Sequence, residues 1–180
     1  MTGNALVLGG GGLTGIAWET GLLYGLEGQG IRLRDAELIV GTSAGSAVAA
    51  QIAGSTSLEE LYQAQIDGKV NALPGRLGLL GMLKLLAAAR GTADERRSLA
   101  KVGKMALRAE TVAEPVRRAV IEQRLPVHAW PEKPLKIPAV NATTGEFTVF
   151  DDSSGVDLVD AVAASCAVPL VWPPVTIGSQ

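Results

Sequence analysis

The pentapeptide Gly41-Thr42-Ser43-Ala44-Gly45 contains a serine that could act as a nucleophile. It matches the pattern G-x-S-x-G, follows a short apolar run and precedes a helix-compatible stretch. This order is typical of a nucleophile elbow, in which a strained turn lifts the serine above a sheet and small neighbours let a substrate approach. A helix that begins there also favours negative charge on the serine oxygen. Taken alone, the motif fits equally well a Ser43 that only caps the helix.

A second glycine-rich turn, Gly10 to Gly15, fits the pattern G-x-G-x-x-G after another apolar run. The same pattern marks dinucleotide-binding sites, which also need an acidic residue at the carboxyl end of the second strand, about 20 residues on. Asp35 has the right separation, but it precedes the predicted strand Leu38–Val40. It would lie at the opposite edge of the sheet, roughly 15 Å away at ~3.3 Å per residue. A nucleotide-binding module is therefore the weaker interpretation.

The two motifs together indicate a function that neither indicates alone. In a parallel sheet both turns lie at the carboxyl edge, so the backbone N–H groups of Gly10, Gly11 and Gly12 can face Ser43 if the two strands are neighbours. Such N–H groups form the oxyanion hole that acyl transfer requires. The combination favours a serine acyl hydrolase, with a nucleotide-binding module and a catalytically inactive scaffold as alternatives.

A serine nucleophile needs a general base, and the chain contains only one histidine. His128 lies in a proline-bounded connection before the predicted strand Leu135–Asn141, which places it at the amino edge of the sheet, away from Ser43. We expect it to have no catalytic part, so a carboxylate is the natural base. The four aspartates nearest the C-terminus are better interpreted as turn, cap and surface residues: Asp151, Asp152, Asp157 and Asp160.

At three places the sequence resembles the patatin-like phospholipases. The stretch 6–15 resembles the family's glycine-rich oxyanion loop, 41–46 resembles its nucleophile elbow, and 163–175 resembles the segment that leads toward its catalytic aspartate. The resemblance implies a three-layer α/β/α fold with a mainly parallel central sheet. It also implies hydrolysis of phospholipid, lysophospholipid or simple acylglycerol esters by a Ser-Asp dyad, without histidine, metal or other cofactor. Ser43 is then the nucleophile, Gly10 to Gly12 the oxyanion loop, and Gly41 and Gly45 the glycines of the elbow.

The sequence departs from the family pattern at two points. Thr14 stands where the family usually has Arg or Lys, which leaves the backbone donors intact but removes a charge near the oxyanion loop. The family's aspartate lies in an Asp-Gly-Gly or Asp-Gly-Ala motif shortly after the segment with which this chain ends. We therefore expect the partner aspartate beyond Gln180, residues 1–180 to be one patatin-like domain without its C-terminal part, and this chain alone to have little activity.

Short apolar runs that alternate with helical patterns predict a parallel sheet in a single α/β domain. The first two strands are expected at 4–8 and 37–40, and two more at 135–141 and 146–150. Helices are expected at 14–27, 46–53, 58–66, 92–107 and 157–166. A further helix reaches about Arg124 from a capping box formed by Thr111 and Glu114.

Charge and composition exclude several classes of function. The formal net charge is −2, so no excess of positive charge is available for nucleic acid, and seven aromatic residues offer little for base stacking. The single cysteine, Cys166, is expected to be a buried thiol, and no signal peptide is apparent at the N-terminus. We expect a cytoplasmic protein.

The most apolar stretch is Leu77–Ala89, bounded by Arg76 and Arg90 and interrupted by Lys84. It is too short to span a bilayer, which needs ~20 apolar residues. A helix that packs into the core is the favoured interpretation. The alternative is a segment that meets lipid and brings the protein into transient contact with a membrane surface.

Overall fold

The computed structural model describes residues 3–68, 75, 78–90 and 94–178. Its strands are β1 (Ala5–Leu8), β2 (Leu38–Gly41), β3 (Leu135–Val140) and β4 (Phe147–Phe150). The helices are α1 (Gly12–Glu27), α2 (Ala44–Ala53), α3 (Leu58–Ile66), α4 (Leu79–Arg90), α5 (Glu95–Ala106), α6 (Glu114–Arg124) and α7 (Leu158–Ser165), and two short 3-10 turns are η1 (Leu33–Asp35) and η2 (Asp152–Ser154).

The four strands form one sheet in the order β1-β2-β3-β4. The β1–β2 and β2–β3 pairs are parallel, and the β3–β4 pair is antiparallel. The predicted α/β class with a mainly parallel sheet is confirmed. Because the parallel strands are added in one direction, right-handed connections place all their helices on the same face.

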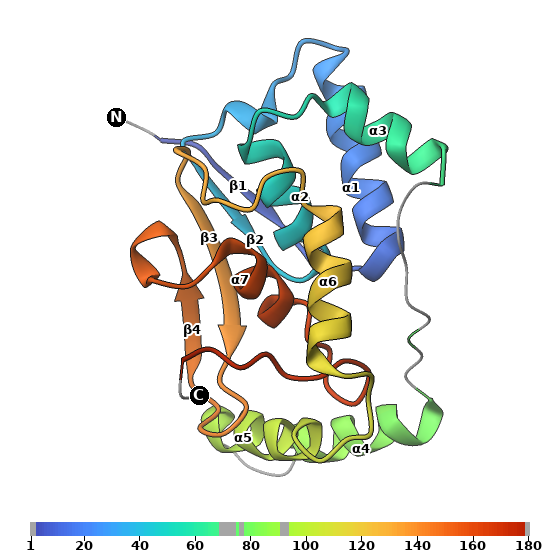
Figure 1. Ribbon diagram of the computed structural model, residues 1–180, viewed down its shortest axis with the longest axis vertical. Coiled ribbons are helices and arrows are strands. Elements are labelled where there is room, and N and C mark those ends of the chain that lie inside the picture. Colours follow the sequence, from blue (N-terminus) through green and yellow to red (C-terminus); the bar gives the residue numbers. More distant parts are fainter. Residues whose placement is uncertain (1–2, 69–74, 76–77, 91–93, 179–180) are drawn as a thin grey trace.

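The core lies between that face and two helices. Helices α2 and α7 pack directly on the strands, with α1 outside α2 and α6 outside α7 (Figure 1). Side chains from β2, β3, α2 and α7 meet there without solvent, among them Ile39, Ile137, Val48 and Val162, each 0% exposed. Burial of this kind supplies most of the free energy that holds the layers together.

The opposite face of the sheet is open among the described residues. Alternate side chains of the strands point to it, and several are apolar and exposed: Val7 to 69%, Phe147 to 65%, with Val140 and Val149 beside them. Lys136 is also exposed there. A helical layer on this face, as in the predicted three-layer arrangement, is not found among the residues that the structure describes.

Most predicted elements are found, with two corrections. The capping box of Thr111 and Glu114 is wrong, because Ala113 occupies the N-cap of α6 without a side-chain bond and Glu114 instead binds Thr176. The interpretation of Leu77–Ala89 as a core helix is wrong for Leu79, Met82 and Leu83 of α4, which are exposed. Arg76 and Leu77 lie outside the described residues.

Candidate active site

The two glycine turns meet at the carboxyl edge of the sheet. Leu8, the last residue of β1, pairs with Gly41 at the end of β2, so the segments that follow run side by side. Two backbone hydrogen bonds join them, from Thr42 N–H to the Leu8 carbonyl (3.0 Å) and from Gly45 N–H to the Gly9 carbonyl (2.8 Å). A Cβ built on Gly10 would lie 3.7 Å from the Ser43 Cβ. The first two strands are therefore neighbours, which is the condition under which the backbone of Gly10 to Gly12 can face Ser43.

Ser43 has a strained backbone. Its φ of 54° and ψ of −116° lie in a region that residues with a side chain rarely adopt. Such a conformation costs of order 1–3 kcal/mol and persists only where the surroundings enforce it. The surroundings here are a strand end, a helix start and α7, which together hold the serine at the turn between β2 and α2. Strain at this position is what a nucleophile elbow requires.

Three hydrogen bonds with side chains hold the peptide groups of Ser43, in addition to the backbone bonds that its carbonyl accepts from the N–H groups of Ser46 and Ala47. Its N–H donates to the hydroxyl oxygen of Ser165 in α7 (3.0 Å). Its carbonyl accepts from the Ser46 hydroxyl (2.7 Å) and from the Cys166 thiol (3.2 Å). Cys166 is buried, as predicted, and burial raises the pKa of its thiol, so it donates as the neutral S–H.

The Ser43 hydroxyl does not cap α2. No side-chain cap bond is made at this N-cap, and the hydroxyl makes no hydrogen bond to any residue that the structure describes. The alternative in which Ser43 serves only as a helix cap is therefore wrong. An unbonded hydroxyl on a strained turn is free to meet a substrate.

Close packing explains why two positions of the elbow are glycine. A Cβ on Gly45 would lie 2.4 Å from the Leu8 carbonyl oxygen, and one on Gly41 would lie 2.3 Å from the Gly45 carbonyl oxygen. Both neighbours are backbone atoms, which cannot move aside as a flexible side chain can. Any larger residue at Gly41 or Gly45 would push α2 away from the strand ends and displace Ser43.

The loop from Gly10 to Gly12 presents unbonded donors beside Ser43. None of the three N–H groups makes a hydrogen bond to a described residue, and all three glycines are exposed. They precede and open α1, while Ser43 precedes α2, so both helices begin next to the two turns. The partial positive charge of both ends favours an anion at this point. Thr14 is exposed in the first turn of α1.

Glu19 is a buried carboxyl that the sequence did not single out. It lies on α1 and is 6% exposed. Burial raises its pKa, and a hydrogen bond from the Gly9 backbone opposes that rise. Its Oε2 atom has no hydrogen-bond partner among the described residues. Glu19 therefore binds the backbone of Gly9, the residue just before the loop from Gly10 to Gly12, from inside the fold.

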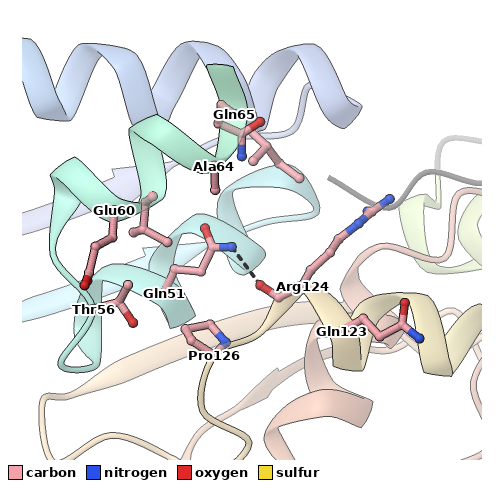
Figure 2. A pocket seen from close by; sticks show the side chains of 10 residues that line it. Gln51, Thr56, Glu60, Ala64, Gln65, Gln123, Arg124 and Pro126 are labelled. Carbon is pink, nitrogen blue, oxygen red and sulfur yellow. Dashed lines mark hydrogen bonds between the residues drawn. The ribbon is translucent and has the colours of Figure 1, made fainter. Parts of the chain in front are cut away.

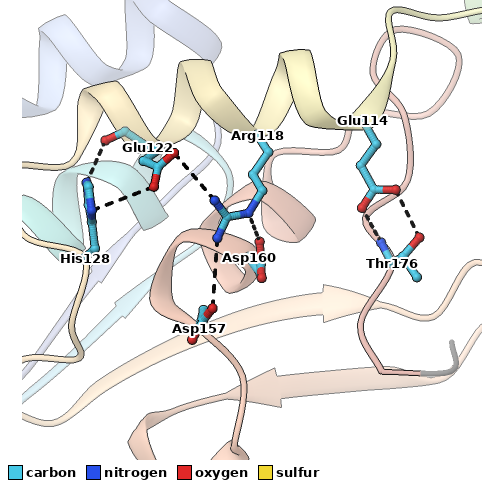
Figure 3. A network of polar contacts seen from close by, with 7 residues as sticks. All are labelled: Glu114, Arg118, Glu122, His128, Asp157, Asp160 and Thr176. Carbon is cyan, nitrogen blue, oxygen red and sulfur yellow. Dashed lines mark hydrogen bonds and ion pairs between the residues drawn. The ribbon is translucent and has the colours of Figure 1, made fainter.

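Neither His128 nor the four aspartates reach Ser43. Figure 3 shows His128 in the connection after α6, beside Glu122, where its Nε2 lies 3.1 Å from the Glu122 carbonyl oxygen. Asp160 and Asp157 pair with Arg118 at 2.6 and 4.0 Å, as Figure 3 also shows. Asp151 pairs with Lys136 and caps η2, which Asp152 begins. Within the described part of the chain, no carboxylate or imidazole contacts the Ser43 hydroxyl.

A cavity of about 240 Å³ lies away from the serine. Figure 2 shows its lining from α1, α2, α3 and the end of α6, with the Gln51 amide donating to the Arg124 carbonyl at 2.9 Å. Its lining includes neither Ser43 nor the loop from Gly10 to Gly12. We place the candidate active site by its geometry and not by this cavity.

Residues 6–180 match the family model described as patatin-like phospholipase. Among solved structures the chain is similar to the type III effector protein ExoU, with 21% identity and a TM-score of 0.48, covering 93% of this chain and 40% of that chain. It is also similar to ExoU in a complex with SpcU from Pseudomonas aeruginosa, with 21% identity and a TM-score of 0.49, covering 94% and 39%. The chain thus spans about two fifths of those solved chains. A comparison with curated proteins found no match.

Proposed function

Because the chain belongs to the patatin-like phospholipase family, we propose that it carries the nucleophile and the oxyanion loop of a serine hydrolase acting on lipid esters. The observation that carries the proposal is the strained, unbonded Ser43 facing a loop of free backbone donors. Phospholipids, lysophospholipids and simple acylglycerols are the substrate class, because each presents an ester carbonyl to such a pair.

In this proposal the Ser43 oxygen attacks the ester carbonyl carbon. The carbonyl oxygen becomes an oxyanion, which the N–H groups of Gly10, Gly11 and Gly12 stabilise. Collapse of the tetrahedral intermediate expels the alcohol and leaves an acyl group on Ser43. Water then attacks the acyl-enzyme and releases the fatty acid. Because α2 begins directly after Ser43 and α1 begins at Gly12, the developing charge would lie near the positive ends of two helix dipoles.

The base belongs to the same proposal. A general base must accept the proton of the Ser43 hydroxyl, and no carboxylate among the described residues makes a hydrogen bond to that hydroxyl. We propose that the base is an aspartate from sequence beyond Gln180. Residues 1–180 are then one patatin-like domain without its C-terminal part, and the catalytic pair is a Ser-Asp dyad. A positioned base contributes typically ~10²–10⁴-fold to rate.

Two measurements test this proposal. A fluorophosphonate probe should label Ser43 in a chain extended through an Asp-Gly-Gly or Asp-Gly-Ala motif, and Ser43→Ala should lose the label. Ser153→Ala, at an exposed serine in η2, is the matched control and should keep it. Turnover of a p-nitrophenyl ester should be about 10²–10⁴-fold slower for residues 1–180 than for the extended chain. Labelling that persists in Ser43→Ala contradicts the assignment, and an extended chain that neither labels nor turns over ester favours an inactive scaffold.

A further inference from the structure

Positive charge is concentrated in the part of the chain that forms α4 and α5. Residues 76–108 contain eight of the 16 Lys and Arg residues but only two of the 18 Asp and Glu residues, a formal charge of +6. The remainder of the chain carries −8. Helices α4 and α5 contact each other and lie together at one end of the molecule (Figure 1). The near-neutral total of the sequence therefore conceals one strongly basic segment, in which Arg96 pairs with Glu146 from outside it (3.1 Å).

One side of α4 is apolar and exposed. Leu79, Met82 and Leu83 are 76%, 49% and 53% exposed, and their spacing of three and four residues puts them on one face of the helix. Gly81 and Leu85, on the other side, are half-buried. A helix that packed only within this domain would bury its leucines, so the exposed face of α4 needs a different environment.

The exposed side of α5 is basic. Arg97, Lys101 and Lys104 recur at four- and three-residue intervals, and Arg108 continues the row in the turn after the helix. Arg97 pairs with Asp94 at the start of the helix (3.2 Å). Lys101, Lys104 and Arg108 form no ion pair within the described part of the chain. Three cations are therefore available to an outside anion.

We propose that α4 and α5 form a docking surface for an anionic lipid bilayer. In this arrangement Leu79, Met82 and Leu83 enter the boundary between headgroups and acyl chains, and Lys101, Lys104 and Arg108 meet lipid phosphates and carboxylates. Apolar side chains beside Lys and Arg are the composition of helices that lie in a membrane interface. A second copy of the chain fits this surface poorly, because the unpaired cations Lys101, Lys104 and Arg108 of the two copies would repel. The proposal rests on the proposed function only in that a lipid ester substrate resides in such a bilayer.

Binding to vesicles tests the docking surface without requiring hydrolysis. The Ser43→Ala variant leaves the lipid intact, so all proteins are compared in that background. The probe is vesicle flotation with phosphatidylcholine alone, and with phosphatidylcholine containing 30% phosphatidylserine (about one anionic lipid in three, enough for a negative surface potential). We expect binding to the anionic vesicles only, and loss of binding at high salt.

Matched variants locate the surface. Lys104→Glu removes one attraction and adds one repulsion, which should weaken binding by about 25-fold, since each basic charge near the surface contributes about fivefold. Arg32→Glu changes the net charge equally but lies in the connection between α1 and β2, at the other end of the molecule (Figure 1), and should have little effect. Met82→Ser with Leu83→Ser should weaken binding without changing the thermal midpoint, because both side chains are exposed.

The outcomes separate this inference from the catalytic one. Equal binding to neutral and anionic vesicles, no binding to either, or equal losses in Lys104→Glu and Arg32→Glu would overturn the docking surface. So would a vesicle-free dimer that Met82→Ser with Leu83→Ser dissociates, because the apolar face would then be a self-contact. None of these results depends on whether Ser43 is a nucleophile, which the labelling experiment decides separately.

Discussion

Replacing Ser43 by glycine should stabilise the protein, although it removes the proposed nucleophile. A residue with a side chain is strained at the Ser43 values of φ 54° and ψ −116°. These values are the mirror image of φ −54° and ψ 116°, and glycine, which has no Cβ, adopts the two conformations about equally readily. The Ser43 hydroxyl makes no bond that would be lost. The backbone conformation at position 43 is therefore strained for serine but unstrained for glycine.

The magnitude follows from two opposing effects. Relief of the strain is worth about 1–3 kcal/mol. The greater freedom of glycine in the unfolded chain costs about 0.4–1 kcal/mol. Ser43→Gly should therefore raise the free energy of unfolding by about 1.3 kcal/mol, the difference between the midpoints of these two ranges, and by up to about 2.6 kcal/mol. Ser43→Ala keeps the strain and should change stability by less than about 0.5 kcal/mol.

Ser57 is the matched control, because it is a true N-cap. Its side chain accepts from the Glu60 N–H in a capping box, and its φ is −74°. Ser57→Ala should cost about 1 kcal/mol and Ser57→Gly a few tenths. Urea unfolding followed by circular dichroism gives all four changes. The reasoning is refuted if Ser43→Gly is no more stable than the parent, or if Ser43→Ala loses as much as Ser57→Ala.

Three further predictions concern the buried groups around the site. Burial raises the pKa of Glu19 in the folded protein above its ordinary value of 4.5. Between the ordinary and the raised pKa, the folded protein retains a proton that the unfolded chain has released, so the free energy of unfolding falls as the pH rises. Glu19→Gln should remove this fall, and an unchanged pH profile of the urea midpoint would contradict it. Gly45→Ala should cost about 3 kcal/mol or more by thermal unfolding because of the clash with Leu8, whereas Gly25→Ala, with open space around it, should gain up to about 1 kcal/mol. The buried Cys166 thiol should react with a disulfide reagent only in denaturant, and reaction at the native rate of an exposed thiol would show that α7 opens.

The sequence predicts local parts of the site well because they are written in consecutive residues. The glycine loop and the elbow are each encoded within six residues, and the buried strands before them are short apolar runs. Their juxtaposition was conditional on the strand order, which periodicity does not specify. The pairing of β1 with β2 supplied it.

Contacts between distant segments could not be predicted in the same way. Ser165 binds the Ser43 N–H across 122 residues, and nothing near either serine indicates the other. Arg117 is 7% exposed although its helix is otherwise rich in charge, because its guanidinium lies 4.1 Å from the centre of the Trp172 ring. Glu19 is charged by type, so a pattern of apolar positions assigns it to the surface. In each case tertiary packing overrode what the local pattern favours.

The hydrogen bonds on the peptide groups of Ser43 also set the time at which a newly made chain acquires its elbow. The donors and acceptors in α7 and at its end, Ser165 and Cys166, follow Ser43 by 122 and 123 residues. At a synthesis rate of about 5–20 residues per second, the ribosome needs on the order of ten seconds to make the intervening chain. During that interval the Gly-Thr-Ser-Ala-Gly sequence has its local partner Ser46 but lacks Ser165 and Cys166, the two partners that come from α7 and its end. Nascent chains should therefore carry the serine in an unstrained, unreactive conformation until α7 has left the ribosome and docked.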